Sequence, residues 1–328
     1  MRTYKETEQI AAADRHQPHC LNSNDYVFAR RQGSTLGKRM STAIRYLSTC
    51  FDSELFAAAE LERTVHIYRR SEANPIRTIE TIMDAGGSRL QIIPDLDILI
   101  SGAFEKNGIQ CNSISSGEVL WTRKDLKRVQ NIRYCPHSGL VSCLFEGREG
   151  VALVPETGEE AGRYRGVKNV FASPYGIERL EEARSYRLVT REGIVRRIAP
   201  LSFGILDAAF SEHVLAISEA ASVVRLIDST NGDEIGRYCP VEGFHMLSLH
   251  SSTEPDEFIG VLWGYKLAGP CFLVHLDISG KELHRFEFSG GYGARYFHDR
   301  RSVLSKSGIE SSWIDSRILC QYAFPETN

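Results

Sequence analysis

The 328-residue sequence lacks the short motifs by which many enzymes and metal proteins are recognised. It contains no CxxC pair, no HxH or HExxH arrangement and no GxSxG turn. Zinc sites and disulfide frameworks need suitably spaced cysteines, so we interpret the eight scattered cysteines as reduced and mostly buried small hydrophobes. We therefore expect no metal and no cofactor. A catalytic set assembled from distant parts of the chain would still escape a motif search.

Long apolar runs and a strong charge of either sign are also missing. No uninterrupted apolar segment reaches the roughly 18 residues that a membrane-spanning helix needs. The polar N-terminal stretch has no apolar core of signal-peptide length. We therefore expect no membrane association and a cytoplasmic location. The formal net charge of −3 argues against nucleic acid as the main partner, because phosphate backbones favour basic proteins.

What the sequence does contain is an internal repeat. An apolar run, a short polar turn and a second apolar run recur seven times, with starts 35 to 49 residues apart. This spacing fits a four-stranded propeller blade of about 40–45 residues. The seven hairpins begin at Thr64, Gly108, Gly150, Ser185, Ser222, Cys271 and Ser311.

Two further apolar runs precede most of the hairpins and complete four strands per unit. Before the first hairpin these runs are AIRYLS (43–48) and ELFAAA (54–59). Turn pairs such as Asn231-Gly232 tolerate positive φ, as tight hairpins require. The fourth unit departs from the pattern. Its segment YGIERLEEA (175–183) is highly charged, and we interpret it as degenerate or inserted, with 177–183 as a helix candidate.

The repeat predicts an all-β fold: a seven-bladed β-propeller of four-stranded antiparallel blades over residues 42–328. A β-sandwich would not need seven copies of one unit, and a β-helix would have shorter coils. Helical repeats would show a 3.6-residue period. Over roughly Thr42 to Phe324 the chain resembles the β-propeller superfamily of the WD40 and quinoprotein-like kind. The resemblance is architectural only, because the Trp-Asp dipeptide and the Gly-His opener are absent.

Residues 1–41 form an N-terminal extension outside the seven units. The segment NDYVFARR (24–31) is strand-like and could close the ring by pairing with the last blade. A flexible peptide is the alternative interpretation.

Three clusters are interpreted as structural rather than chemical. His16, His19 and Cys20 lie close together but have no fourth ligand and no regular frame around them. Two RYCP copies, at 133–136 and 237–240, fall on non-equivalent strands, which argues against a shared reactive cysteine. The glycine-rich stretch 289–293 precedes a predicted strand, whereas a phosphate cradle needs a helix there.

The connections after the second and third units supply the candidate partner-binding residues. In an antiparallel meander, second–third loops and blade-to-blade connections emerge on one face, and rigid scaffolds commonly present recognition residues on such loops. An acidic protein surface is the expected partner, because charge complementarity governs encounter and specificity. For any single residue, an ordinary solvated loop is the alternative. This predicted basic sector consists of Arg123, Lys124, Lys127, Arg128, Arg163, Arg165 and Lys168.

These features favour a non-catalytic, protein-binding propeller that recruits or neutralises one protein partner. A complex scaffold and an immunity protein against a cognate toxin are two forms of that role. The alternative is an enzyme with a metal or small-molecule site at the central channel, built from side chains of several blades.

Overall fold

The structure is a computed structural model, and it describes the chain over nineteen ranges. These ranges are 34–39, 44–50, 53–60, 63–72, 74–83, 88–105, 107–135, 138–173, 176–181, 187–189, 195–198, 205–211, 213–220, 222–251, 257–264, 271–288, 295–297, 302–307 and 318–323.

The described strands form seven four-stranded sheets in which the strands follow one another as a meander. We number them blades 1 to 6 and a closing blade. Blade 1 holds β2 (Ile44–Thr49), β3 (Leu55–Glu60), β4 (Thr64–Arg69) and β5 (Pro75–Glu80). Blade 2 holds β6 (Ser88–Ile93), the short 3-10 helix η1 (Pro94–Leu96), β7 (Ile98–Ala103), β8 (Ile109–Ser113) and β9 (Val119–Arg123). Blade 3 holds β10 (Val129–Cys135), β11 (Leu140–Phe145), β12 (Glu149–Leu153) and β13 (Glu160–Arg165).

The remaining sheets repeat this order. Blade 4 holds β14 (Val167–Ser173), β15 (Gly176–Glu181), β16 (Arg187–Val189) and β17 (Val195–Arg197). Blade 5 holds β18 (Ile205–Ser211), β19 (Val214–Glu219), β20 (Val223–Asp228) and β21 (Glu234–Tyr238). Blade 6 holds β22 (Phe244–Ser251), β23 (Glu257–Gly264), β24 (Cys271–Asp277) and β25 (Glu282–Phe288). The closing blade holds β26 (Arg295–Phe297), β27 (Ser302–Ser307), β28 (Ile318–Ala323) and β1 (Ser34–Arg39).

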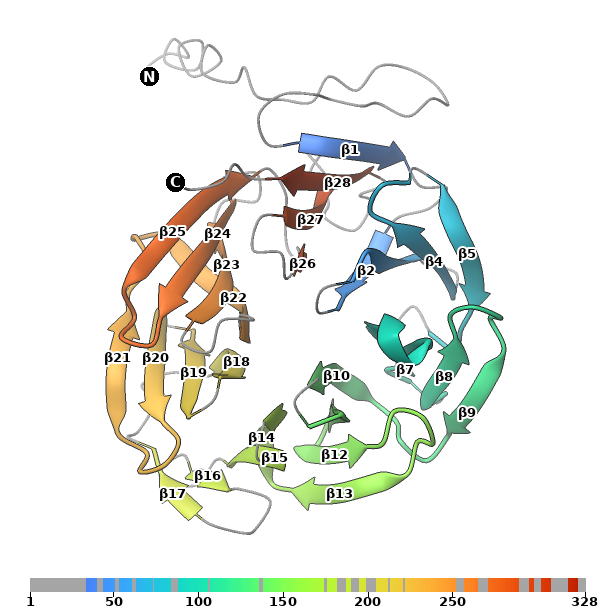
Figure 1. The fold of residues 1–328 in the computed structure, drawn as a ribbon. Helices are drawn as coiled ribbons and strands as arrows, with labels where there is room; N and C mark the ends of the chain where they lie inside the picture. The colour runs from blue at the N-terminus through green and yellow to red at the C-terminus, as the bar shows by residue number, and fades with distance from the viewer. Residues whose placement is uncertain are drawn as a thin grey trace, which may run out of the picture.

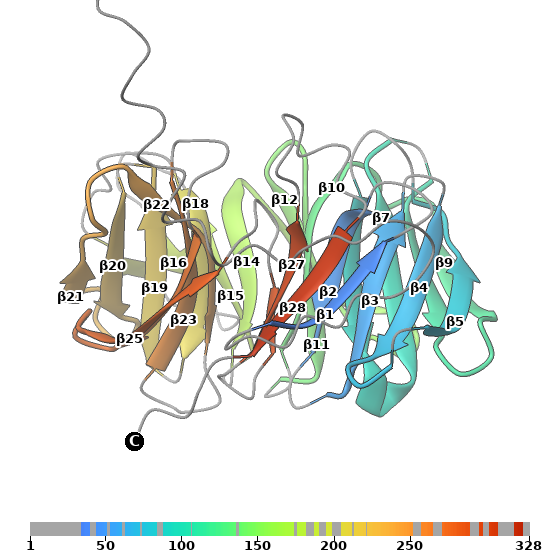
Figure 2. The ribbon, with the colours of Figure 1, turned by 90° about the horizontal axis from the view of Figure 1, so that it is seen from above.

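The sheets stand around a central axis (Figure 1), and the same ring is seen from its side in Figure 2. The first strand of each blade lies toward the centre and the last strand forms the outer rim. The prediction of an all-β propeller with four-stranded antiparallel blades is confirmed. Side chains are described over most of blades 1, 2, 3, 5 and 6, and these five blades carry the structural argument.

The N-terminal strand β1 joins the two ends of the chain. It pairs antiparallel with β28, from Ser34 opposite Tyr322 to Arg39 opposite Ile318. Closure by an N-terminal strand was predicted for residues 24–31, which lie outside the described residues; the closing strand is 34–39. The closing strand thus lies within the N-terminal extension 1–41, nearer to the first blade than the predicted segment. An outermost strand needs only a backbone ladder, so STLGKR carries little hydrophobic signal.

Two other expectations also need correction. Of the hairpin predicted from Ser311, the described residues include β28, which pairs with β27 on one side and with β1 on the other, so β1 takes the place predicted for the last strand of the blade. The charged segment of the fourth unit is neither an insertion nor a helix over the residues described. Gly176–Glu181 is the strand β15, paired with β14 on one side and β16 on the other. Backbone pairing on both edges outweighs its weak strand propensity.

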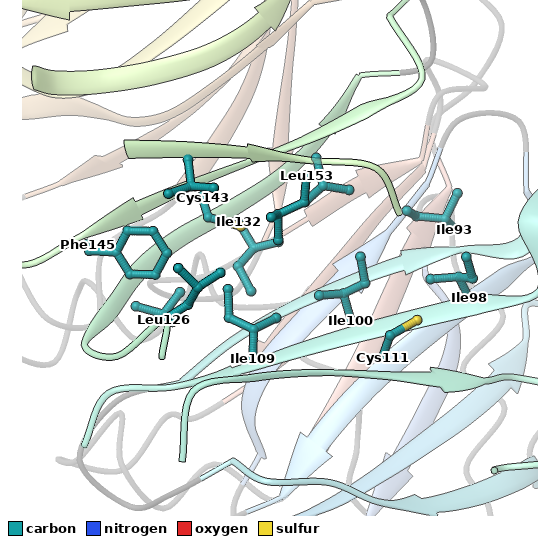
Figure 3. Packing of buried hydrophobic residues seen from close by; sticks show 13 residues of the cluster. Ile93, Ile98, Ile100, Ile109, Cys111, Leu126, Ile132, Cys143, Phe145 and Leu153 are labelled. Carbon is teal, nitrogen blue, oxygen red and sulfur yellow. The ribbon is translucent and has the colours of Figure 1, made fainter. Parts of the chain in front are cut away.

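The hydrophobic core lies between neighbouring sheets. Between blades 2 and 3, side chains such as Ile100 and Ile109 form one cluster with Ile132 and Cys143 (Figure 3). Burying one such aliphatic side chain stabilises the fold by about 1.5–3 kcal/mol, and a single blade could not bury this face alone. Burial raises the pKa of the Cys111 and Cys143 thiols to about 12, so both stay protonated at neutral pH.

Glycine at position 108 is required by a close contact between two strands. Gly108 has φ +85°, and an added Cβ would overlap the carbonyl oxygen of Arg123 and lie 2.8 Å from Lys124 Cα. We expect Gly108→Ala to lower the free energy of unfolding by about 2–4 kcal/mol, from strain and overpacking together. Urea denaturation would measure the change.

Gly139→Ala is the matched control for this substitution. Gly139 also has positive φ, +65°, but an added Cβ there would meet no atom within 4 Å. Its expected cost is about 1 kcal/mol, from backbone conformation alone. Equal losses in the two variants would contradict the proposed clash at Gly108.

Candidate functional site

The outer strands of blades 1, 2, 3, 5 and 6 each begin with a β-bulge. In β9, for example, Val119 lies opposite Asn112 and Trp121 lies opposite Cys111, so Leu120 is the extra residue. A bulge places two residues of one strand against one residue of its neighbour. The extra residues of β5, β9, β13, β21 and β25 are Ile76, Leu120, Ala161, Ile235 and Leu283.

The bulge brings together residues that a regular strand would separate. In a regular strand, residues i and i+3 face opposite sides, and one extra residue restores them to the same side. Three outer strands use this geometry for an ion pair between a glutamate and an arginine. The pairs are Glu160–Arg163 at 2.5 Å, Glu234–Arg237 at 2.7 Å and Glu282–Arg285 at 2.7 Å.

The same bulges turn apolar side chains toward solvent. Ile76, Leu120 and Ile235 are bulged residues, and their exposed fractions are 39%, 50% and 43%. Val119, directly before Leu120, is 54% exposed. The outer rim therefore combines surface ion pairs with single apolar side chains, and β9 has two such side chains in succession.

The residues of the predicted basic sector occupy two neighbouring blades. Arg123 ends β9, and Lys124, Lys127 and Arg128 follow it in the connection to β10. Arg163 and Arg165 were expected in the connection after the third unit. The structure instead places both in β13, the outer strand of blade 3. Lys168 also lies in a strand, β14, and its side chain is outside the described residues.

Arg123 and Arg163 form one ion-pair cluster with carboxylates between blades 2 and 3. Arg123 contacts Asp125 at 2.6 Å and Glu160 at 2.5 Å, while Arg163 contacts Glu160 at 2.5 Å and Glu149 at 2.9 Å. A hydrogen bond from Arg123 lowers the pKa of Asp125, and hydrogen bonds from Arg163 and then Arg123 lower that of Glu160. Their stabilising contribution is present above the unfolded-state pKa values and is lost as the pH falls through the lower folded-state values, below about pH 4.

The remaining charges of the basic sector differ in their pairing. Arg128 contacts Glu146 at 2.8 Å in an exposed pair, which is worth no more than about 1 kcal/mol. Lys124, Lys127 and Arg165 are exposed, and within the described part of the chain none of the three forms an ion pair. The positive charge available to a partner is therefore smaller than the seven residues suggest.

A second charged cluster connects the inner strands of blades 3, 5 and 6. Arg133 of β10 forms an ion pair with Asp207 of β18 and donates to the carbonyl oxygen of Ala208. The other Asp207 oxygen accepts a hydrogen bond from the Leu249 backbone N–H of β22, at 2.8 Å. Both carboxylate oxygens are thus used by protein groups, and Asp207 acts as a structural tie between three inner strands. No sequence pattern connects residues 74 positions apart.

Sequence reasoning missed the bulge signature, although aligning the hairpins would have revealed it. Blades 3, 5 and 6 share a sequence pattern at this bulge. A glycine with positive φ is followed two residues later by glutamate, and three residues after the glutamate by arginine. Blades 1 and 2 depart from this pattern: in blade 2 Gly117 is followed at the same spacing by Val119 and Thr122, and in blade 1 the corresponding strand positions hold Pro75 and Thr78. The clusters around His16 and at 289–293, which were interpreted as structural, lie outside the described residues.

Comparison with known proteins identifies the fold. No family model matches the chain, and no curated protein matches it. A solved structure of U3-55K is similar with TM-score 0.69 and 11% identity, covering 88% of this chain and 98% of that one. The crystal structure of the RRP9 WD40 repeats is similar with the same TM-score and identity, covering 88% and 97%. The chain therefore has the fold of WD40-repeat propellers. No helix in the described residues is long and apolar enough to cross a membrane.

Proposed function

We propose that this chain is a protein-binding scaffold. Its ring of seven blades binds one partner where the outer strands of blades 2 and 3, β9 and β13, end. The observation that carries the proposal is the contrast within the basic sector. Arg123 and Arg163 are neutralised by carboxylates of the propeller, whereas Lys124, Lys127 and Arg165 are exposed and have no such partner among the described residues. Cations presented in this way favour a partner of opposite charge.

The geometry of the two blades supports a shared contact surface. Lys124 follows β9, and Arg165 ends β13. Both lie where an outer strand turns inward to the next blade, so they emerge on the same face of the ring. Blade 3 also holds β9 in place, because Arg123 donates to the Gly158 carbonyl at 2.9 Å. Such pre-organisation lowers the conformational entropy that binding must overcome.

The partner that fits this surface is a protein with an acidic patch. The propeller would recruit that protein into a complex or neutralise it, as an immunity protein neutralises a toxin, and a cytoplasmic location is part of the same proposal. Binding rather than catalysis is the activity that we propose for the propeller.

Charge reversal at the three exposed cations tests the proposal. We expect Lys124→Glu/Lys127→Glu/Arg165→Glu to weaken partner capture about tenfold or more, because each reversal replaces attraction by repulsion. The measurement uses the tagged wild-type chain and the variant as baits in extracts of the source organism. Captured proteins are quantified by mass spectrometry, and thermal melts of both baits establish that the fold is intact.

Arg63→Glu/Arg69→Glu/Lys281→Glu is the control, since it changes net charge equally at exposed positions of other parts of the ring. It should retain the partner. Equal capture by the wild type and the first variant, both with intact melts, would reject this surface as the contact.

A further inference from the structure

We infer that the outer edge of blade 2 binds an extended segment of the partner protein as an additional β-strand. In this segment every second residue is apolar. Acidic residues lie only at one end, the end beside Lys124 and Lys127. This inference rests on the proposed function and specifies how the partner is held. The edge concerned is that of β9, Val119–Arg123, which ends its sheet. In Figure 1, β9 lies on the outer rim.

Exposed edge strands invite pairing with other chains, and natural proteins usually blunt them with charges or proline. Four of the five fully described outer strands carry such a device at the bulge. In β13, β21 and β25 it is the Glu–Arg ion pair. In β5 it is Pro75, which occupies the first strand position and has no N–H to donate.

Of these five outer strands, β9 of blade 2 is the one with neither the Glu–Arg ion pair nor the proline. Val119 and Thr122 take the positions of the glutamate and the arginine, and Leu120 is the bulged residue. Val119 is 54% exposed and Leu120 is 50% exposed. An incoming strand would therefore meet uncharged side chains where the other blades present an ion pair.

The edge is also held rigid from its other face. Trp121 donates through its indole N–H to the Pro155 carbonyl at 2.8 Å, and Arg123 reaches the Gly158 carbonyl at 2.9 Å. An added Cβ on Gly158 would lie 2.7 Å from the Trp121 ring, so the turn of blade 3 packs closely on β9. A fixed strand offers its backbone groups without an ordering cost, as strand addition requires.

Charge specifies the end of the incoming segment. Lys124 and Lys127 directly follow the strand, are exposed and pair with no described carboxylate. Acidic residues at one end of an added strand would lie beside them, while its apolar residues cover Val119 and Leu120. A partner segment fits these charges better than a second copy of the chain, because antiparallel pairing with a second β9 would place only one acidic residue, Glu118, beside the two lysines.

The test is peptide binding to the full chain, measured by fluorescence anisotropy. The probes are labelled peptides with two aspartates next to alternating valine and threonine residues, and matched peptides with lysines in place of the aspartates. We expect the acidic peptides to bind at least about tenfold more tightly than the lysine peptides.

Val119→Glu/Thr122→Arg rebuilds in blade 2 the ion pair of the other blades. It should weaken binding of the acidic peptides about tenfold or more while the melt stays unchanged. Ile235→Glu is the control, because Ile235 is the similarly exposed bulged residue of blade 5. It should bind the peptides as the wild type does.

Three results of the peptide-binding and sizing experiments would overturn the inference. The first is the absence of peptide binding by the wild type, and the second is equal binding by Val119→Glu/Thr122→Arg. The third is a concentration-dependent dimer that this variant abolishes, which would assign the edge to a second copy. If this variant keeps the natural partner that the Lys124/Lys127/Arg165 reversal loses, strand addition is wrong and the proposed function stands. If neither variant loses a partner, the proposed function fails as well.

Discussion

Deletion of residues 1–40 is expected to lower the melting temperature by roughly 6–7 °C, because it removes β1 and opens the ring. β1 pairs with β28 along its whole length. Losing a ladder of four or five backbone hydrogen bonds, each worth about 1 kcal/mol net, costs about 4–5 kcal/mol. In a protein of this size, 1 kcal/mol corresponds to about 1.5 °C. Differential scanning calorimetry would measure the shift.

A shorter deletion, of residues 1–33, is the control because it keeps β1 intact. The difference between the two deletions isolates the contribution of β1. The longer deletion also uncovers the edge of β28, and an uncovered edge strand promotes association with other chains. We therefore expect it to form oligomers in size-exclusion chromatography. Identical melts for the two deletions would show that ring closure does not depend on this strand.

The second large effect is expected at the centre of the ring. Asp207→Ala should lower the free energy of unfolding by about 3–5 kcal/mol, the usual cost of leaving one member of a buried ion pair alone. Its carboxylate pairs with Arg133 and accepts hydrogen bonds from the backbone N–H groups of Ala208 and Leu249. The side chain of Asp207 is 8% exposed and that of Arg133 is 25% exposed, so water only partly replaces the lost contacts.

Glu146→Ala is the matched control, since it removes the acidic partner of the exposed Arg128 pair. Its expected cost is below about 1 kcal/mol. Asp207→Asn should fall between the two, because the amide keeps one acceptor but leaves the guanidinium charge uncompensated. Urea denaturation at neutral pH gives all three values. A loss at Asp207 no greater than that at Glu146 would contradict its role as a tie between inner strands.

The candidate site was only partly readable from the sequence. The positions of Lys124 and Lys127 between two strands follow from hairpin spacing, and the structure places them there. The sequence pattern predicts Arg163 in a connection, because apolar alternation does not show where the outer strand of blade 3 ends. Its neutralisation by Glu149 and Glu160 depends on the bulge and on the register of two strands. The exposed pair Val119–Leu120 was missed, since a valine-leucine pair in a strand is normally expected to be half buried.

The sequence by itself determined the meander, because a strand pattern recurring about every 40 residues needs only turn chemistry and apolar alternation to be recognised. It also determined that the sheets must stack, since each blade has an apolar face that it cannot bury alone. Only the tertiary structure decided which strand closes the ring and which charges are neutralised. Those outcomes depend on contacts such as Arg133 with Asp207, between residues far apart in the chain. Local propensity carries no information about such contacts, because their partners meet only when the blades come together around the axis.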